Sequence, residues 1–162
     1  MDVNLALAET LRLLGPRLDA AECRWTVISS AAVALHTGDA EGVGDVDVLI
    51  DEAGAAAAFA ELDLPLVSGA GTHLFRSRLF GTWQGGPLTV EVFAGFELCT
   101  DERWQEVHVE ERQEIKFGGV RAYVPAAAEL ATMLLRFGRE KDLARAAQLS
   151  ASGRFPSRPG SV

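Results

Sequence analysis

The sequence predicts an α/β protein of the α+β kind, in which helices pack on a mixed β-sheet and a pair of helices ends the chain. Two observations carry this prediction. Short β-prone runs alternate with helical segments in the first half, and hairpin patterns followed by two helical segments fill the second half. A chain of 162 residues has room for one core, so we expect a single domain over residues 1–150 and a flexible tail over residues 151–162.

The first elements are a helix, a short strand and a second helix. Leucines recur at helical spacing, so we expect a helix over about residues 2–19 that is disturbed at Gly15-Pro16. Residues 25–28 are β-prone, and Ser29-Ser30 lead directly into the helical run 31–35. Serine is a good N-cap, so a strand, a serine turn and a helix follow one another with almost no linker.

A glycine-rich loop at residues 38–44 then leads into an acidic strand at residues 45–50. Successive side chains of a strand alternate between faces, so Asp45 and Asp47 point to the same side. An alanine-rich helix is expected at residues 53–62.

Strands are expected at residues 72–80 and 88–93, joined as a hairpin across residues 81–87. In the second of these strands Glu91 projects opposite to Val90 and Val92.

The last third of the chain predicts a second hairpin and two helices. Gly118-Gly119 separates the strand patterns of residues 113–117 and 120–124 and is a strong two-residue turn signal. We expect Pro125 to begin a helix that runs to about residue 137, and another helix over residues 139–149. The acidic run 106–114 is interpreted as a solvated strand pair and its connection.

The composition excludes several classes of protein. Fifteen Lys and Arg against 23 Asp and Glu give a net charge of −8, which disfavours non-specific binding to duplex DNA. Cys23 and Cys99 have no cysteine or histidine at metal-ligand spacing, so neither a zinc ribbon nor a disulfide framework is expected. No signal-peptide pattern or membrane-spanning apolar run is visible, and we expect a cytoplasmic protein with no membrane partner.

Three acids on two predicted strands are the most informative feature. On one strand face, the Cβ atoms of Asp45 and Asp47 lie roughly 6–7 Å apart, a spacing at which two carboxylates can share a divalent cation such as Mg²⁺. Glu91 reaches the same cluster if its strand lies beside theirs. At this point the alternative of a plain solvated acidic face stays open.

The serine turn is the second feature. The N–H groups at the start of the following helix and the hydroxyls of Ser29 and Ser30 can form an anion site for a nucleotide phosphate. Helix capping alone is the alternative.

In this order, these residues resemble the nucleotidyltransferase superfamily of the DNA polymerase β-like fold. The family pattern is an apolar residue, Gly, Gly or Ser, a helix, then Asp-apolar-Asp/Glu-apolar and a third acid on a later strand. Residues 28–30, 45–48 and 89–92 follow it here, with Ser29 at the first glycine position. Residues 138–143 also resemble the Arg-x-Lys-Asp signature of small prokaryotic members, which include minimal nucleotidyltransferases and abortive-infection-type toxins.

The resemblance implies a metal-dependent nucleotidyltransferase that moves a nucleoside monophosphate from an NTP, ATP in the first place, to a hydroxyl of a small molecule, a tRNA or a protein. It implies that the metal ligands and catalytic acids for Mg²⁺ (or Mn²⁺) are Asp45, Asp47 and Glu91, with Glu91 orienting or deprotonating the acceptor hydroxyl. It implies that the nucleotide-binding residues are Ser29, Ser30, Arg139 and Lys141.

The alternative function is a catalytically degenerate member of the fold that acts as an antitoxin or protein-interaction module. Small enzymes often self-associate, so a homo-oligomer is among the expected assemblies.

Overall fold

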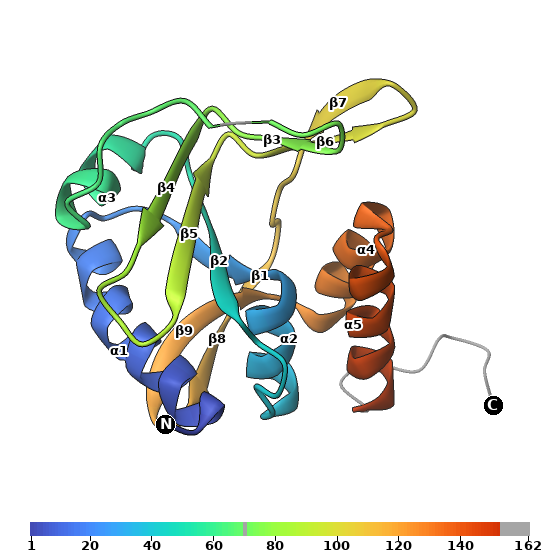
Figure 1. Ribbon diagram of the computed structural model, residues 1–162, viewed down its shortest axis with the longest axis horizontal. Helices are drawn as coiled ribbons and strands as arrows, with labels where there is room; N and C mark the ends of the chain where they lie inside the picture. The colour runs from blue at the N-terminus through green and yellow to red at the C-terminus, as the bar shows by residue number, and fades with distance from the viewer. Residues whose placement is uncertain (70, 153–162) are drawn as a thin grey trace.

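A computed structural model describes residues 1–69 and 71–152 of the chain (Figure 1). In chain order the elements are α1 (Val3–Ala20), β1 (Trp25–Ile28), α2 (Ser29–Thr37), β2 (Asp45–Ile50), α3 (Ala55–Glu61), β3 (Phe75–Arg76), β4 (Leu79–Trp83), β5 (Thr89–Ala94), β6 (Glu97–Thr100), β7 (Arg103–Glu106), β8 (Arg112–Phe117), β9 (Val120–Pro125), α4 (Ala127–Phe137) and α5 (Glu140–Ala151).

A mixed four-stranded sheet forms the centre of the fold, as the sequence predicts. Its strand order is β1-β2-β5-β4, with β2 and β5 parallel and the other neighbours antiparallel. The β8–β9 hairpin packs against β1 and α1, and a small sheet of order β3-β6-β7 extends beyond the central one (Figure 1). Helix α2 lies on β1 and β2 and packs against α4 and α5, so the C-terminal helix pair reaches the central sheet through α2.

Two apolar clusters hold these layers together. The larger one joins α1, α2 and α3 to the valine-rich face of the central sheet, and it includes the fully buried Trp25 and Phe59. The smaller one joins the β3-β6-β7 sheet to α4 through Phe96, Leu98 and Phe137. The second cluster matters for function because it builds one wall of the cavity described below.

Helix α1 runs without interruption through Gly15 and Pro16, and here the prediction of a disturbance is wrong. A proline inside a helix costs about 3 kcal/mol, but burial of a leucine side chain contributes about 1.5–3 kcal/mol. The helix has four fully buried leucines on one face, namely Leu7, Leu11, Leu14 and Leu18. Gly15 faces Trp25, where an added Cβ would lie 3.6 Å from the indole Cζ2. Tertiary packing therefore outweighs the local signal.

The prediction of a single strand at residues 72–80 is wrong. The first part of this segment, β3, pairs with β6 in the small sheet, and its second part, β4, pairs with β5. Gly81 lies within β4 and not in the expected turn. An added Cβ there would meet Leu64 Cδ1 at 2.8 Å and Phe59 Cε2 at 3.2 Å. This glycine permits close packing of α3 and its following segment on the sheet.

The β6–β7 hairpin was not expected, and the acidic run 106–114 is less solvated than expected. Val107 and Val109 in that run are buried, and both belong to the smaller apolar cluster. The run connects β7 to β8.

The second hairpin is confirmed, with Gly118 and Gly119 both at positive φ (56° and 77°), as a two-residue turn of this kind requires. Pro125 ends β9, however, and does not begin a helix. Its carbonyl oxygen lies 2.7 Å from His36 Nε2, and α4 begins two residues later.

The alanine-rich helix α3 is shorter than expected, and α5 continues to Ala151, where a tail was expected to start. Residues 153–162 of that tail lie outside the described residues. In the described part of the chain, no helix is long and apolar enough to cross a membrane.

Replacing Phe59 by alanine tests the larger core. The side chain is fully buried between α3 and the sheet, so Phe59→Ala is expected to lower the free energy of unfolding by about 3–5 kcal/mol in urea titrations. Leu135→Ala is the control: Leu135 is 59% exposed, so a change within about 0.5 kcal/mol is expected. A loss below about 1 kcal/mol for Phe59→Ala would contradict this packing.

Candidate active site

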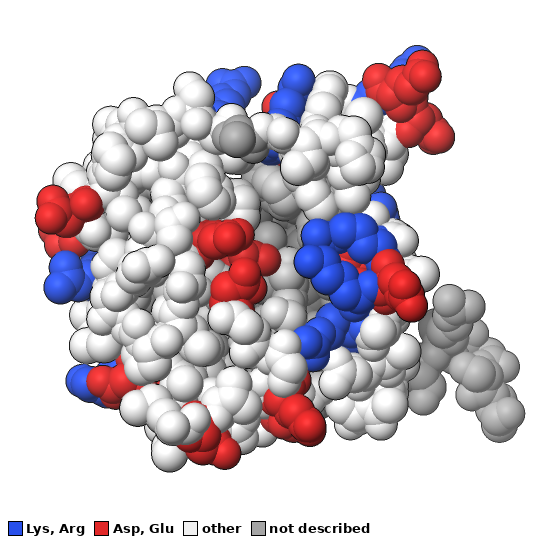
Figure 2. All heavy atoms as spheres, in the orientation of Figure 1, with Lys and Arg blue, Asp and Glu red and all other residues white. Residues whose placement is uncertain are grey.

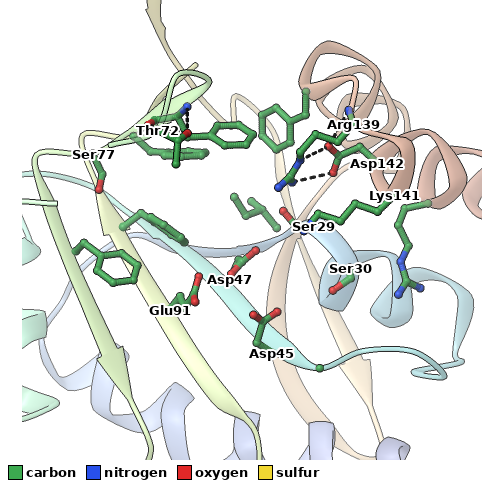
Figure 3. A pocket seen from close by; sticks show the side chains of 18 of the residues that line it. Ser29, Ser30, Asp45, Asp47, Thr72, Ser77, Glu91, Arg139, Lys141 and Asp142 are labelled. Atoms are coloured by element: carbon green, nitrogen blue, oxygen red, sulfur yellow. Dashed lines mark hydrogen bonds and ion pairs between the residues drawn. The ribbon is translucent and has the colours of Figure 1, made fainter. Parts of the chain in front are cut away.

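Three carboxylates meet on one face of the central sheet. In the parallel pairing of β2 with β5, Asp47 lies directly opposite Glu91, and Asp45 lies two residues earlier on β2. One oxygen from each of the three side chains lies within 4.8 Å of the others. Figure 3 shows all three pointing into the same space. The expected adjacency of the two strands is therefore observed, and the cluster draws on segments more than 40 residues apart.

Asp47 lies in an unfavourable electrostatic position. Burial, together with the negative charges of Asp45 and Glu91, raises the pKa of Asp47 to about 7, while the Ser29 hydroxyl opposes this rise. Among the described residues, Asp47 Oδ1 is a buried side-chain atom that has no hydrogen-bond partner. A buried polar oxygen without a partner costs about 1–3 kcal/mol. A cation or a hydrogen-bond donor placed beside the cluster would satisfy this atom.

Ser29 begins helix α2 and does not cap it. The N-cap residue is Ile28, and no side chain caps this helix end, so the expected serine cap is wrong. Ser29 has a φ of 59°, in the left-handed region that favours glycine. The backbone here adopts a conformation that favours glycine, at the position to which the resemblance assigns a motif glycine, although the residue is serine. Ser29 and Ser30 both line the cavity, at the end of β1 and beside the acids (Figure 3).

Helix α5 and its N-cap residue supply cationic side chains across from the acids. Arg139, Lys141 and Arg145 line the same cavity. Arg139 is held firmly: its Nε and Nη2 donate to the two carboxylate oxygens of the buried Asp142 at 2.6 and 3.0 Å, and its guanidinium lies 4.8 Å from the ring centroid of Phe75. Its positive charge is therefore largely balanced by Asp142.

Arg145 was missed by the sequence analysis. It lies one helical turn after Lys141, and its Nη2 donates to the Gly42 carbonyl at 3.1 Å, which ties α5 to the glycine-rich loop. An added Cβ at Gly42 would lie 3.2 Å from that nitrogen. The i, i+4 spacing from Lys141 was the available signal, since such residues share one face of a helix.

The cavity has a volume of about 560 Å³, within the usual 300–1,000 Å³ of small-molecule sites. Figure 2 shows an acidic group facing a basic group across a hollow in the surface. The cavity also has an aromatic wall that the sequence analysis did not identify, made of Phe75, Phe80, Phe93, Phe96 and Phe137.

Comparison with solved structures identifies the architecture. A protein from Thermotoga maritima (TM1012), whose name assigns it to the nucleotidyltransferases, matches with a TM-score of 0.67 at 22% identity, over 88% of this chain and 89% of that chain. The chain has the nucleotidyltransferase fold.

Two further matches with this fold are more distant. A nucleotidyltransferase-like antigenic protein from Paracoccidioides brasiliensis matches with a TM-score of 0.55 at 16% identity, over 91% of this chain and 75% of that chain. ANT(2″)-Ia, solved in complex with adenylyl-2″-tobramycin, matches with a TM-score of 0.58 at 9% identity, over 88% of each chain. No protein-family model and no curated protein sequence matches the chain.

The backbone at Ser29 gives a stability prediction. Ser29→Gly and Ser29→Ala both remove the hydroxyl, but only glycine adopts φ = 59° without strain. We expect the glycine variant to be about 1–2 kcal/mol more stable than the alanine variant in urea unfolding. Equal stabilities would show that this position is not in the left-handed region in solution.

The raised pKa of Asp47 gives a pH dependence. Because the folded-state pKa of about 7 exceeds the ordinary value of 3.8, the folded protein binds more protons than the unfolded chain between these values. Without divalent cations, the contribution of Asp47 to the free energy of unfolding should fall as pH rises from about 4 to 7, by a few kcal/mol (about 1.4 per pKa unit).

Urea titrations in EDTA at pH 5 and pH 8 measure this effect. Other groups also titrate, so the relevant quantity is the difference between the wild type and Asp47→Asn. The variant should gain stability relative to the wild type at pH 8. A pH-independent difference would show an ordinary pKa for this carboxyl.

Proposed function

We propose that the protein is a metal-dependent nucleotidyltransferase that moves a nucleoside monophosphate from an NTP, ATP in the first place, to a hydroxyl acceptor. The observation that carries the proposal is the cluster of Asp45, Asp47 and Glu91 with one buried oxygen unpartnered, at the floor of a cavity whose far wall is cationic. The nucleotidyltransferase fold supports it.

The residues of the cluster suit a hard divalent cation. Three carboxylates offer only oxygen ligands, which Mg²⁺ and Mn²⁺ prefer, and a cation would satisfy Asp47 Oδ1 and relieve the repulsion that raises the pKa of Asp47. Asp45, Asp47 and Glu91 would hold it. When bound, the cation neutralises charge on the NTP phosphates and on the departing pyrophosphate.

The other residues in this proposal bind phosphate. N–H groups in the first turn of a helix are free to bind an anion, so the start of α2 at Ser29 and Ser30 is suited to the triphosphate. Lys141 faces the same space from α5 and adds positive charge. Arg139 donates two of its N–H groups to Asp142 and lies against Phe75, so it would bind phosphate from a fixed position.

Glu91 takes the proton of the acceptor hydroxyl in this scheme. The acceptor oxygen bonds to the α-phosphorus, the bond from that phosphorus to the bridging oxygen breaks, and pyrophosphate leaves. Glu91 is suited to this role because it lies on β5, on the side of Asp47 away from the start of α2.

The alternative is a degenerate member of the fold that serves as an antitoxin or interaction module. It has one feature in its favour, the serine side chain at the position where the family has glycine. Nucleotide binding separates the two functions.

The test is thermal unfolding with Mg²⁺ alone, ATP alone and both together. A ligand at about 100 times its dissociation constant adds roughly 2.7 kcal/mol, which raises Tm by about 5–10 °C for a chain of this size. We expect a shift of this size only when both are present, and its loss in Asp47→Asn. The matched control is Asp63→Asn: Asp63 is exposed and does not line the cavity, so this variant should keep the shift.

Pyrophosphate release with a panel of hydroxyl acceptors extends the test. Asp47→Asn should slow release about a thousandfold, roughly 4 kcal/mol of transition-state stabilisation. No Tm shift with any of ATP, GTP, CTP and UTP would reject catalysis and favour the interaction module.

A further inference from the structure

The strand order separates two sides of the carboxylate cluster. In the order β1-β2-β5-β4, helix α2 follows directly from β1, so Ser29 lies on the β1 side of Asp47. Glu91 lies on β5, and β4 lies beyond it. Figure 3 shows this arrangement, with Ser29, Ser30 and Lys141 on one side of the acids and Glu91 toward the other. If phosphates occupy the first side, the acceptor must approach from the β5–β4 side.

A pair of phenylalanines occupies the β5–β4 side. Phe93 lies two residues after Glu91 and shares its face of the sheet, and Phe80 on β4 is directly opposite Phe93. Their ring centroids are 5.3 Å apart with planes tilted by 53°. Both rings are half-buried and line the cavity. They form an apolar surface next to the carboxylate that would activate the acceptor.

The charges around the cavity disfavour a cationic acceptor. Besides the three clustered acids, the only carboxylate lining the cavity in the described part of the chain is Asp142, and Arg139 occupies both of its oxygens. The cavity is also lined by four cations, namely Arg76, Arg139, Lys141 and Arg145. Apart from the cluster that would hold the metal, the described lining therefore offers no free carboxylate to bind a cationic acceptor.

We propose that Phe80 and Phe93 form the acceptor subsite, and that the acceptor is a hydroxyl compound with an aromatic ring and no positive charge. The ring stacks on the phenylalanine pair and brings its hydroxyl to Glu91. This inference rests on the proposed function and specifies its substrate class. Stacking of a ring on an aromatic side chain strengthens binding by roughly fivefold to a hundredfold, enough for selection among acceptors.

Isothermal titration calorimetry with three probes tests the subsite. N-acetyl-tyrosinamide carries a phenolic hydroxyl, adenosine carries ribose hydroxyls beside a ring, and tobramycin is a polycationic amino sugar. Each is titrated with and without Mg²⁺ and a non-hydrolysable ATP analogue. We expect at least one aromatic probe to bind more tightly than tobramycin. Whichever aromatic probe binds more tightly indicates whether the acceptor's ring is a phenol or a nucleoside base.

Phe93→Leu and Phe80→Leu remove the ring and keep apolar volume, so both should remain folded. Each should weaken binding of the aromatic probe about tenfold, and Leu135→Ala, at an exposed residue that does not line the cavity, should not. Unchanged affinity in both leucine variants, or tighter binding of tobramycin, would overturn the proposal. The proposal is also overturned if the leucine variants weaken binding of the ATP analogue and not of the probe, because the two rings would then hold the base of the NTP.

The two proposals fail separately. Absence of the Mg²⁺- and ATP-dependent Tm shift in the wild type rejects the nucleotidyltransferase function, whether or not the probes bind. A normal Tm shift with no ring-dependent probe binding rejects the acceptor subsite alone.

Discussion

The parallel pairing of β2 with β5 is the constraint on which the rest of the site depends. Its register places Asp47 beside Glu91, so carboxylates of like charge share a half-buried surface. The result is a raised pKa for Asp47 and one buried oxygen without a partner. Such local instability persists only where the surrounding structure determines it, and it is typical of functional sites.

The opposite face of the same two strands fixes the position of the carboxylates. Val46, Val48, Val90 and Val92 are fully buried against the larger core. Because side chains alternate along a strand, a slip of one residue would turn these valines to the cavity and the acids into the core. Apolar burial on one face therefore fixes the position of the carboxylates on the other, and the stability of the fold and the geometry of the site have one origin.

Helix α5 completes the site from the other side. The Arg139–Asp142 pair closes the start of this helix, and Arg145 joins it to the loop at Gly42. The guanidinium of Arg139 lies against Phe75, whose ring packs edge-on against Phe137 with centroids 5.0 Å apart. Acids, cations and aromatic rings thus come from different elements, and each group is held by contacts of its own.

The sequence by itself determined the elements with strong local periodicity: the acidic strand, the Gly118-Gly119 hairpin and the mixed α/β class. It also indicated that Asp45 and Asp47 share one strand face, because their spacing is a local property, whereas the pairing of β2 with β5 decided that Glu91 joins them. Only the tertiary structure decided that α1 continues through Pro16, that residues 72–80 divide between two sheets, and that aromatic rings and Arg145 line the cavity. Apart from the i, i+4 spacing of Arg145 from Lys141, these outcomes leave no local pattern, because they depend on packing between segments distant in sequence.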